Sequence, residues 1–136
     1  MMIDTPDGIA FARAAARRMA LSLEINGMHR SSGRQTAYSI VKQVYGFRGN
    51  RQSVLDDLNE YIECELRLRE MSEEEYIMVK RVTEDVITHL GDQLDQPRFE
   101  DFIARAERQE AISHAVRQGA SDLFYVMIVR QNAGTQ

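Results

Sequence analysis

Cysteine is almost absent from this sequence, and its scarcity excludes two classes of small protein. Cys64 is the single cysteine among 136 residues, so the chain cannot form an internal disulfide framework and has no cysteine-rich zinc site. This cysteine usage is typical of a reducing compartment. The first residues, MMIDTPDGIA, lack the basic and then apolar pattern of a secretory signal. We therefore expect a cytoplasmic protein.

Long apolar runs and an excess of positive charge are also absent. No run approaches the roughly 18 apolar residues of a membrane span, so we expect no membrane contact. The net charge is −4, which excludes a uniformly basic nucleic-acid binder. Charge is nevertheless segregated, because Gly8–Gln52 holds eight basic side chains against Glu24 alone, whereas residues from Ser53 onward carry −9. This asymmetry predicts an anionic partner for the first part of the chain, and a cationic partner, or the first part itself, for the remainder.

Only two prolines interrupt a sequence whose apolar residues recur at helical spacing almost throughout. Start signals predict helices that begin near Thr5, Ser31 or Ser32, Asn50, Ser72 and Asp95. Stop signals place the ends of four of these helices at Gly27, Gly46, Gly91 and Gly119. The pattern therefore predicts an all-α protein, a compact single-domain bundle of five to six helices over residues 1–130, followed by a disordered tail over 131–136.

Two segments carry specific packing predictions. In the first helix, apolar residues spaced three and four apart predict an inward stripe of Ile9, Ala12, Ala16, Met19 and Leu23. The run Leu123–Val129 fits a buried helix or a buried strand. A short helix capped by Ser121 is favoured because a lone strand has no partner here, and the alternative is strand pairing across the two-fold axis of a homodimer.

Catalytic and metal-binding patterns are weak. The three histidines lie far apart in sequence, Cys64 is flanked by glutamates that disfavour a thiolate, and no nucleophile or P-loop motif is present. Asp85 with His89, and Glu110 with His114, are spaced at i,i+4 and could bring metal ligands together if their helices packed antiparallel. Helix-end histidines beside carboxylates are the more ordinary explanation. We expect a non-enzymatic protein with no cofactor and no metal.

Two neighbouring patterns could bind an anion. Ser31, Ser32 and Gly33 precede a helix and could hold a phosphate with the flanking arginines, although a serine cap with solvated arginines is the ordinary explanation. The helices on either side of Gly46–Asn50 resemble a helix–turn–helix motif, although an ordinary helical hairpin is more common. The candidate nucleic-acid or anion-binding residues are Arg30, Ser31, Ser32, Arg34, Arg48, Arg51 and Gln52.

An acidic stretch offers a different binding surface. Nine carboxylates lie between Asp56 and Glu75 against two arginines, a pattern usually explained by a solvated helix face. Such a face could also occupy the basic site of another protein. The candidate protein-binding residues are Asp56, Asp57, Glu60 and Glu63.

The segments LEINGMHR, from Leu23, and GRQTAY, from Gly33, followed by YGFRG, from Tyr45, resemble short uncharacterised helical proteins of bacteriophage type. The resemblance is confined to the N-terminal third. It implies a small, phage-encoded binding or regulatory protein acting in a bacterial cytoplasm, with no activity or site residues attached. Together with the charge pattern, it favours a protein that engages nucleic acid through an N-terminal arginine-rich patch. The alternative is an inhibitor or adaptor that docks its acidic face on a basic protein surface.

Overall fold

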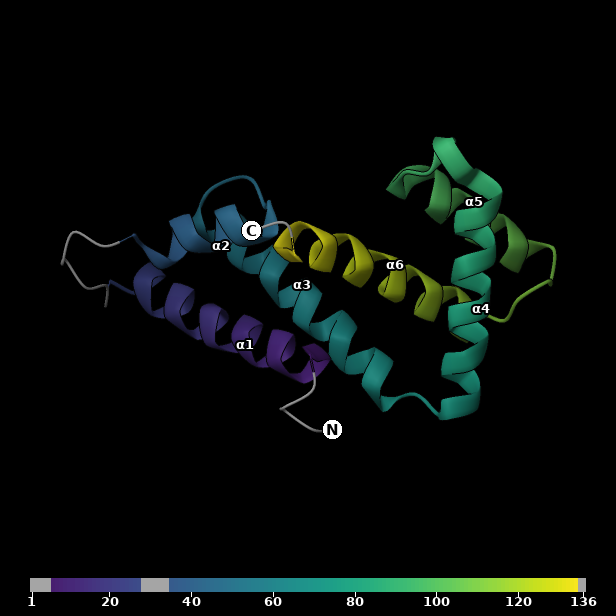
Figure 1. Ribbon diagram of the computed structural model, residues 1–136, viewed down its shortest axis with the longest axis horizontal. Helices are drawn as coiled ribbons and strands as arrows, with labels where there is room; N and C mark the ends of the chain where they lie inside the picture. Colours follow the sequence, from purple (N-terminus) through teal and green to yellow (C-terminus); the bar gives the residue numbers. More distant parts are fainter. Residues whose placement is uncertain (1–5, 28–34, 135–136) are drawn as a thin grey trace. The chain divides into compact units, whose positions relative to one another are not determined.

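A computed structural model describes residues 6–27 and 35–134, and these form six α-helices and one short 3-10 helix (Figure 1). The elements are α1 (Pro6–Ile25), α2 (Ala37–Tyr45), α3 (Arg51–Glu70), α4 (Glu73–Leu90), η1 (Gly91–Gln93), α5 (Gln96–Arg108) and α6 (His114–Gly134). The described ranges contain no strand, which confirms the predicted all-α bundle. None of their helices is both long enough and apolar enough to cross a membrane.

Side-chain caps explain where several helices begin. Asn50, Ser72 and Asp95 act as predicted, each accepting a hydrogen bond from a backbone N–H three residues later at 2.8–3.2 Å. Thr36 caps α2 by accepting from Ser39 N–H at 3.1 Å. The start predicted at Ser31 or Ser32 lies outside the described residues. Gly46 ends α2 as predicted, in the left-handed conformation with φ of 74°.

The break between the last two long helices is not where the sequence predicted it. The predicted helix through Gln118 ends at Arg108, and Glu110 adopts the left-handed conformation with φ of 60°. The N–H groups of Glu110 and Ala111 donate to the carbonyls of Glu107 and Ala106, so the end of α5 has the hydrogen bonds of a Schellman motif. Ser113 Oγ then accepts from Val116 N–H at 3.1 Å, at the start of α6.

The structure has one continuous helix, α6, where the sequence predicted the end of one helix at Gly119 and a separate short helix over Leu123–Val129. Residues 123–129 are helical as favoured, but Ser121 is no cap, since its hydroxyl donates to Glu100 Oε1 at 2.7 Å. The disordered tail predicted over residues 131–136 is corrected for 131–134, because the helix continues to Gly134, and residues 135–136 lie outside the described ranges. Asn132 Nδ2 donates to the carbonyl of Tyr45 at 3.1 Å, which fixes this last turn against the end of α2.

The chain divides into two compact units, of which unit 1 comprises Met1–Glu63 with Val129–Gln136 and unit 2 comprises Cys64–Ile128. The predicted single domain over residues 1–130 stays a prediction. The core of unit 1 includes Val41 and Tyr45 of α2 and the buried residues Val54, Leu58, Tyr61 and Ile62 of α3. α1 contributes Ala14 and Leu21, whereas Met19 of the predicted stripe is 67% exposed. That prediction was wrong because this alanine-rich helix has more than one apolar face. The face that is buried is the one with Ala14 and Leu21.

Unit 2 has its own apolar core, built by α4, α5 and α6. Val86, Phe99, Ile103, Ala120 and Phe124 form its buried cluster. The rings of Phe99 and Phe124 stack with centroids 4.1 Å apart, so two aromatic side chains join α5 to α6. Val79, Thr83 and Val86, spaced four and three apart along α4, are buried and form its inward face.

Candidate anion-binding site

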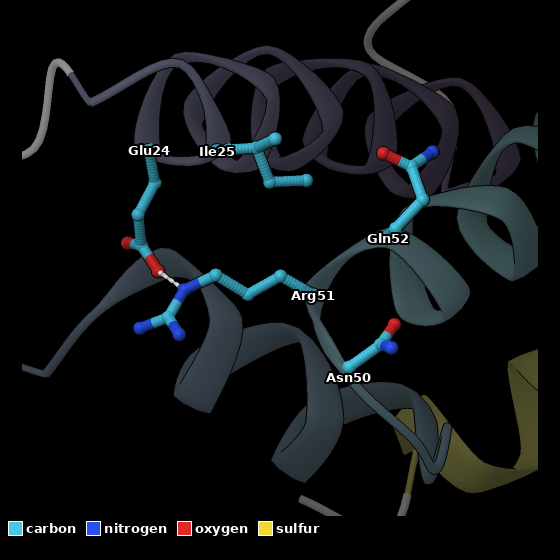
Figure 2. A pocket seen from close by; sticks show the side chains of 5 residues that line it. All are labelled: Glu24, Ile25, Asn50, Arg51 and Gln52. Carbon is cyan, nitrogen blue, oxygen red and sulfur yellow. Dashed lines mark hydrogen bonds and ion pairs between the residues drawn. The ribbon is translucent and has the colours of Figure 1, made fainter.

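The structure places only part of the predicted anion site. Arg30, Ser31, Ser32 and Arg34 lie outside the described residues. Arg51 and Gln52, at the start of α3, line a pocket of about 480 Å³ together with Glu24, Ile25 and Asn50 (Figure 2). Arg48 precedes this pocket in the α2–α3 connection and is exposed.

The positive charge of Arg51 in this first pocket is already paired with a carboxylate, that of Glu24. Glu24 Oε1 accepts from Arg51 Nε at 3.0 Å (Figure 2). Glu24 Oε2 accepts from the backbone N–H of Ala37 at 2.7 Å. The N–H of Tyr38 donates to Glu24 Oε1 at 3.3 Å. Burial raises the pKa of Glu24, but the hydrogen bonds from Arg51 and the two backbone groups outweigh it and hold the pKa below its ordinary value of 4.5. Glu24 therefore occupies the N-terminus of α2, the helix end that the sequence analysis considered for a phosphate.

The first residues of α3, which follow the turn of the predicted helix–turn–helix motif, also have partners within the chain. Gln52 Nε2 donates to Asp56 Oδ1 at 2.9 Å, and the guanidinium of Arg51 lies 4.8 Å from the ring centroid of Tyr38. The hydroxyl of Ser53 donates to the carbonyl of Arg48 at 3.4 Å. A helix–turn–helix contact with bases would have to compete with these interactions. Among the described members of the predicted set, exposed Arg48 is thus the one best placed to meet an external anion.

The acidic candidates follow one another along α3. Asp56, Glu60 and Glu63 are exposed and recur at spacings of four and three, which places them on one face of the helix. Asp57 is half-buried beside this face, and its pKa is raised, chiefly by burial and also by the negative charge of Asp56. The structure thus brings three of the four predicted protein-binding residues onto one surface.

A second pocket gathers basic side chains that the sequence did not connect. We call this pocket of about 370 Å³ the arginine pocket; it is lined by Ala10, Arg13, Arg17, Val44, Tyr45, Tyr61, Arg130, Ala133 and Gly134. All nine residues belong to unit 1. Arg13 is exposed, whereas Arg17 and Arg130 are half-buried. None of the described residues that line it carries a carboxylate.

Aromatic packing holds one of these arginines in place. Arg17 Nη1 donates to the hydroxyl of Tyr45 at 3.0 Å, and its guanidinium carbon lies 5.5 Å from the centroid of that ring. Tyr45 is 3% exposed and packs against Phe47 and Tyr61, with ring centroids 5.5 Å and 5.9 Å away. A guanidinium has five N–H donors in a rigid fork, so the bond to Tyr45 orients Arg17 and leaves donors that can face the pocket.

The two histidine–carboxylate pairs considered for metal binding do not assemble. Among residues 6–27 and 35–134, no group of three or more histidine, cysteine or carboxylate side chains is placed to hold a metal. Glu110 lies beyond the end of α5, and His114 Nδ1 lies 3.0 Å from Glu107 Oε2 instead. Arg117 donates to the other oxygen of Glu107 at 3.0 Å. The ring of His89 packs against Phe102, with centroids 5.0 Å apart.

Comparison with known proteins adds no family to this description: no protein-family model matches the chain, and no curated protein or solved structure matches it at a significant level. The site therefore stands on its geometry. Sequence reasoning missed Arg13, Arg17 and Arg130 because they come from both ends of the chain. The spacing of Arg13 and Arg17 at i,i+4 was the available signal, since like charges one helical turn apart repel unless an anion or another contact compensates.

Proposed function

We propose that this protein is a non-enzymatic helical binding protein that engages an anionic partner, nucleic acid, through basic side chains of unit 1. The observation that carries the proposal is the arginine pocket, where Arg13, Arg17 and Arg130 line one cavity and none of the described lining residues is acidic. Arginine pairs with phosphate through two parallel hydrogen bonds, which favours a phosphate-bearing partner. The charge of +7 over Gly8–Gln52 supports the same conclusion.

Fluorescence anisotropy with labelled single-stranded DNA, RNA and duplex DNA tests this function. We expect affinity to fall steeply with salt, because phosphate contacts release counterions, with the logarithmic slope changing by about 0.7–0.9 per contact. Changing Arg13 and Arg48 together to Gln removes two exposed basic side chains outside the core and should weaken binding and flatten this slope. The matched control is Arg105→Gln, an exposed arginine of unit 2 that pairs with Asp101. Absence of salt-dependent binding by the wild type, even at low ionic strength, would refute the proposal.

A second candidate function rests on the exposed carboxylates of α3. Asp56, Glu60 and Glu63 share one face, as a surface that docks on a basic protein would require. If this inhibitor or adaptor function holds, reversing the three residues to Lys abolishes capture of a protein partner from nuclease-treated lysate. The same reversal leaves nucleic-acid binding intact or strengthens it under the leading proposal, because it removes repulsion from phosphates.

A further inference from the structure

The lining of the arginine pocket indicates the kind of phosphate that it accepts. Its volume of about 370 Å³ lies in the range of small-molecule sites, and its lining comes from α1, α2, α3 and α6 of unit 1. In a continuous nucleic-acid strand, every internal phosphate is linked to a sugar on both sides. Such a phosphate fits an open groove better than a pocket that is lined on several sides. A phosphate at the end of a molecule has one substituent and can enter such a pocket.

The charge of the lining residues indicates the same ligand. A phosphomonoester carries about −1.5 to −2 at neutral pH and presents three acceptor oxygens, whereas an internal phosphodiester carries one charge and two free oxygens. Three guanidinium groups line the pocket, and because each has five N–H donors, a contact such as that of Arg17 with Tyr45 uses only part of them. Their number and charge therefore match the phosphomonoester better than the diester.

Small and ordered side chains give the pocket its shape. Ala10, Ala133 and Gly134 contribute almost no side-chain volume, which leaves room beside the arginines. Buried Tyr45 orients Arg17 through the bond between Arg17 Nη1 and its hydroxyl at 3.0 Å. Orientation before binding lowers the entropy lost when a ligand is held, so this arrangement favours a specific contact over a diffuse one.

We infer that the arginine pocket of Arg13, Arg17 and Arg130 binds a terminal phosphate monoester. This inference rests on the proposed function and deepens it, since it names the chemical group recognised within the nucleic acid. Two sources carry the same group, the phosphorylated end of a nucleic-acid strand and a free mononucleotide. The end of a strand is the source that the proposed function requires.

The experiment compares one single-stranded oligonucleotide bearing a 5′-phosphate with the same strand bearing a 5′-hydroxyl. We expect the phosphorylated strand to bind the full-length protein at least about tenfold more tightly, as one lost charge-assisted contact of about 1.4 kcal/mol implies. A 5′-hydroxyl strand longer by one nucleotide separates the effect of an end group from that of added charge. Competition with adenosine monophosphate and with inorganic phosphate tells whether the free group suffices.

Three variants connect the effect to the pocket. Arg13→Gln and Arg17→Gln should each remove most of the preference for the 5′-phosphate. Arg13 is exposed, so its variant keeps the test valid if loss of the Arg17–Tyr45 bond disturbs folding. The matched control is Arg18→Gln, an adjacent arginine of α1 that lines a different pocket with Met19 and Leu55, and it should keep the preference.

The possible results distinguish failure of the terminal-phosphate inference from failure of the proposed function. Equal binding of the phosphorylated and hydroxyl strands would overturn the terminal-phosphate inference and leave nucleic-acid binding standing. Binding of adenosine monophosphate in calorimetry, lost in Arg13→Gln, without binding of any strand would support the pocket and refute nucleic acid as the partner. Absence of binding to any of these probes would overturn both.

Discussion

Gly119 of α6 lies so close to Val79 of α4 that a Cβ atom on the glycine would be 2.5 Å from the valine Cγ2. The same atom would lie 3.1 Å from Met71 Cε. Real Cβ atoms essentially never make a 2.5 Å contact, so α6 can approach α4 this closely only where it has no side chain. Both neighbours belong to unit 2, and Val79 is fully buried.

We therefore expect Gly119→Ala to destabilise the protein by about 1–3 kcal/mol, the usual cost of overpacking. Helix propensity alone predicts the opposite sign, because alanine is favoured over glycine inside a helix by about 1 kcal/mol. Urea denaturation followed by circular dichroism measures the difference. Gly134→Ala is the control, since a Cβ there meets no atom within 4 Å, and its stability should change little. An unchanged or raised midpoint for Gly119→Ala would show that the helices can separate at no cost.

This glycine also shows where sequence reasoning reaches its limit. A glycine at the end of a periodic stretch predicts a stop, and Gly46 and Gly91 do follow the last residues of α2 and α4. Gly119 has the same local signature but is buried inside α6, because its role is set by a contact with α4 that is distant in sequence. Caps and periodicity predicted the helical fold, since both depend on residues a few positions apart.

The candidate site was less predictable for the same reason. Arg13 and Arg130 are 117 positions apart in the sequence and line one pocket only once the chain has folded. Conversely, Glu24 is a single acidic residue within a basic segment of the sequence. In the structure it pairs with Arg51 and accepts a hydrogen bond from the first backbone N–H of α2. Composition predicted the sign of the charge in this region, but tertiary contacts decide which arginines face a cavity.

The left-handed residue after α5 predicts an increase in stability on substitution, whereas Gly119→Ala is expected to decrease it. Glu110 has φ of 60°, a conformation that favours glycine because it crowds a Cβ atom. Glu110→Gly should therefore raise the free energy of unfolding by about 0.5–1 kcal/mol, the strain relief exceeding the added entropy of the unfolded chain. Glu110→Ala keeps the Cβ atom and should bring no such gain. Equal stability of the two variants in thermal unfolding would show that the strain is negligible.

A partly buried ion pair in unit 2 provides a third prediction. Asp122 is 8% exposed and accepts two hydrogen bonds from Arg67, at 2.9 Å and 3.0 Å. Asp122→Ala should lower the free energy of unfolding by about 1–2 kcal/mol, a modest loss because the Arg67 side chain is 48% exposed and can be solvated. Asp101→Ala, which breaks the exposed pair with Arg105, should cost less than about 0.5 kcal/mol. A cost for Asp122→Ala no larger than this control would mean that the buried pair adds no stability.

The pH dependence of stability tests the contacts of Glu24. Burial raises the pKa of this carboxyl, but the hydrogen bonds from Arg51, Ala37 and Tyr38 outweigh that effect and hold the folded pKa below 4.5. A depressed folded pKa stabilises the protein above the unfolded pKa, and this contribution is lost as the pH falls through the folded value. Glu24→Gln should therefore cost about 1–2 kcal/mol near neutral pH and progressively less below about pH 4.5, where the wild-type carboxyl becomes protonated. Denaturant midpoints of both proteins between neutral and acidic pH measure this convergence, and Glu84→Gln, at an exposed position of α4, controls for general loss of charge. A difference that stays constant as the pH falls would show that the carboxylate charge of Glu24 is not what holds α2 and Arg51 in place.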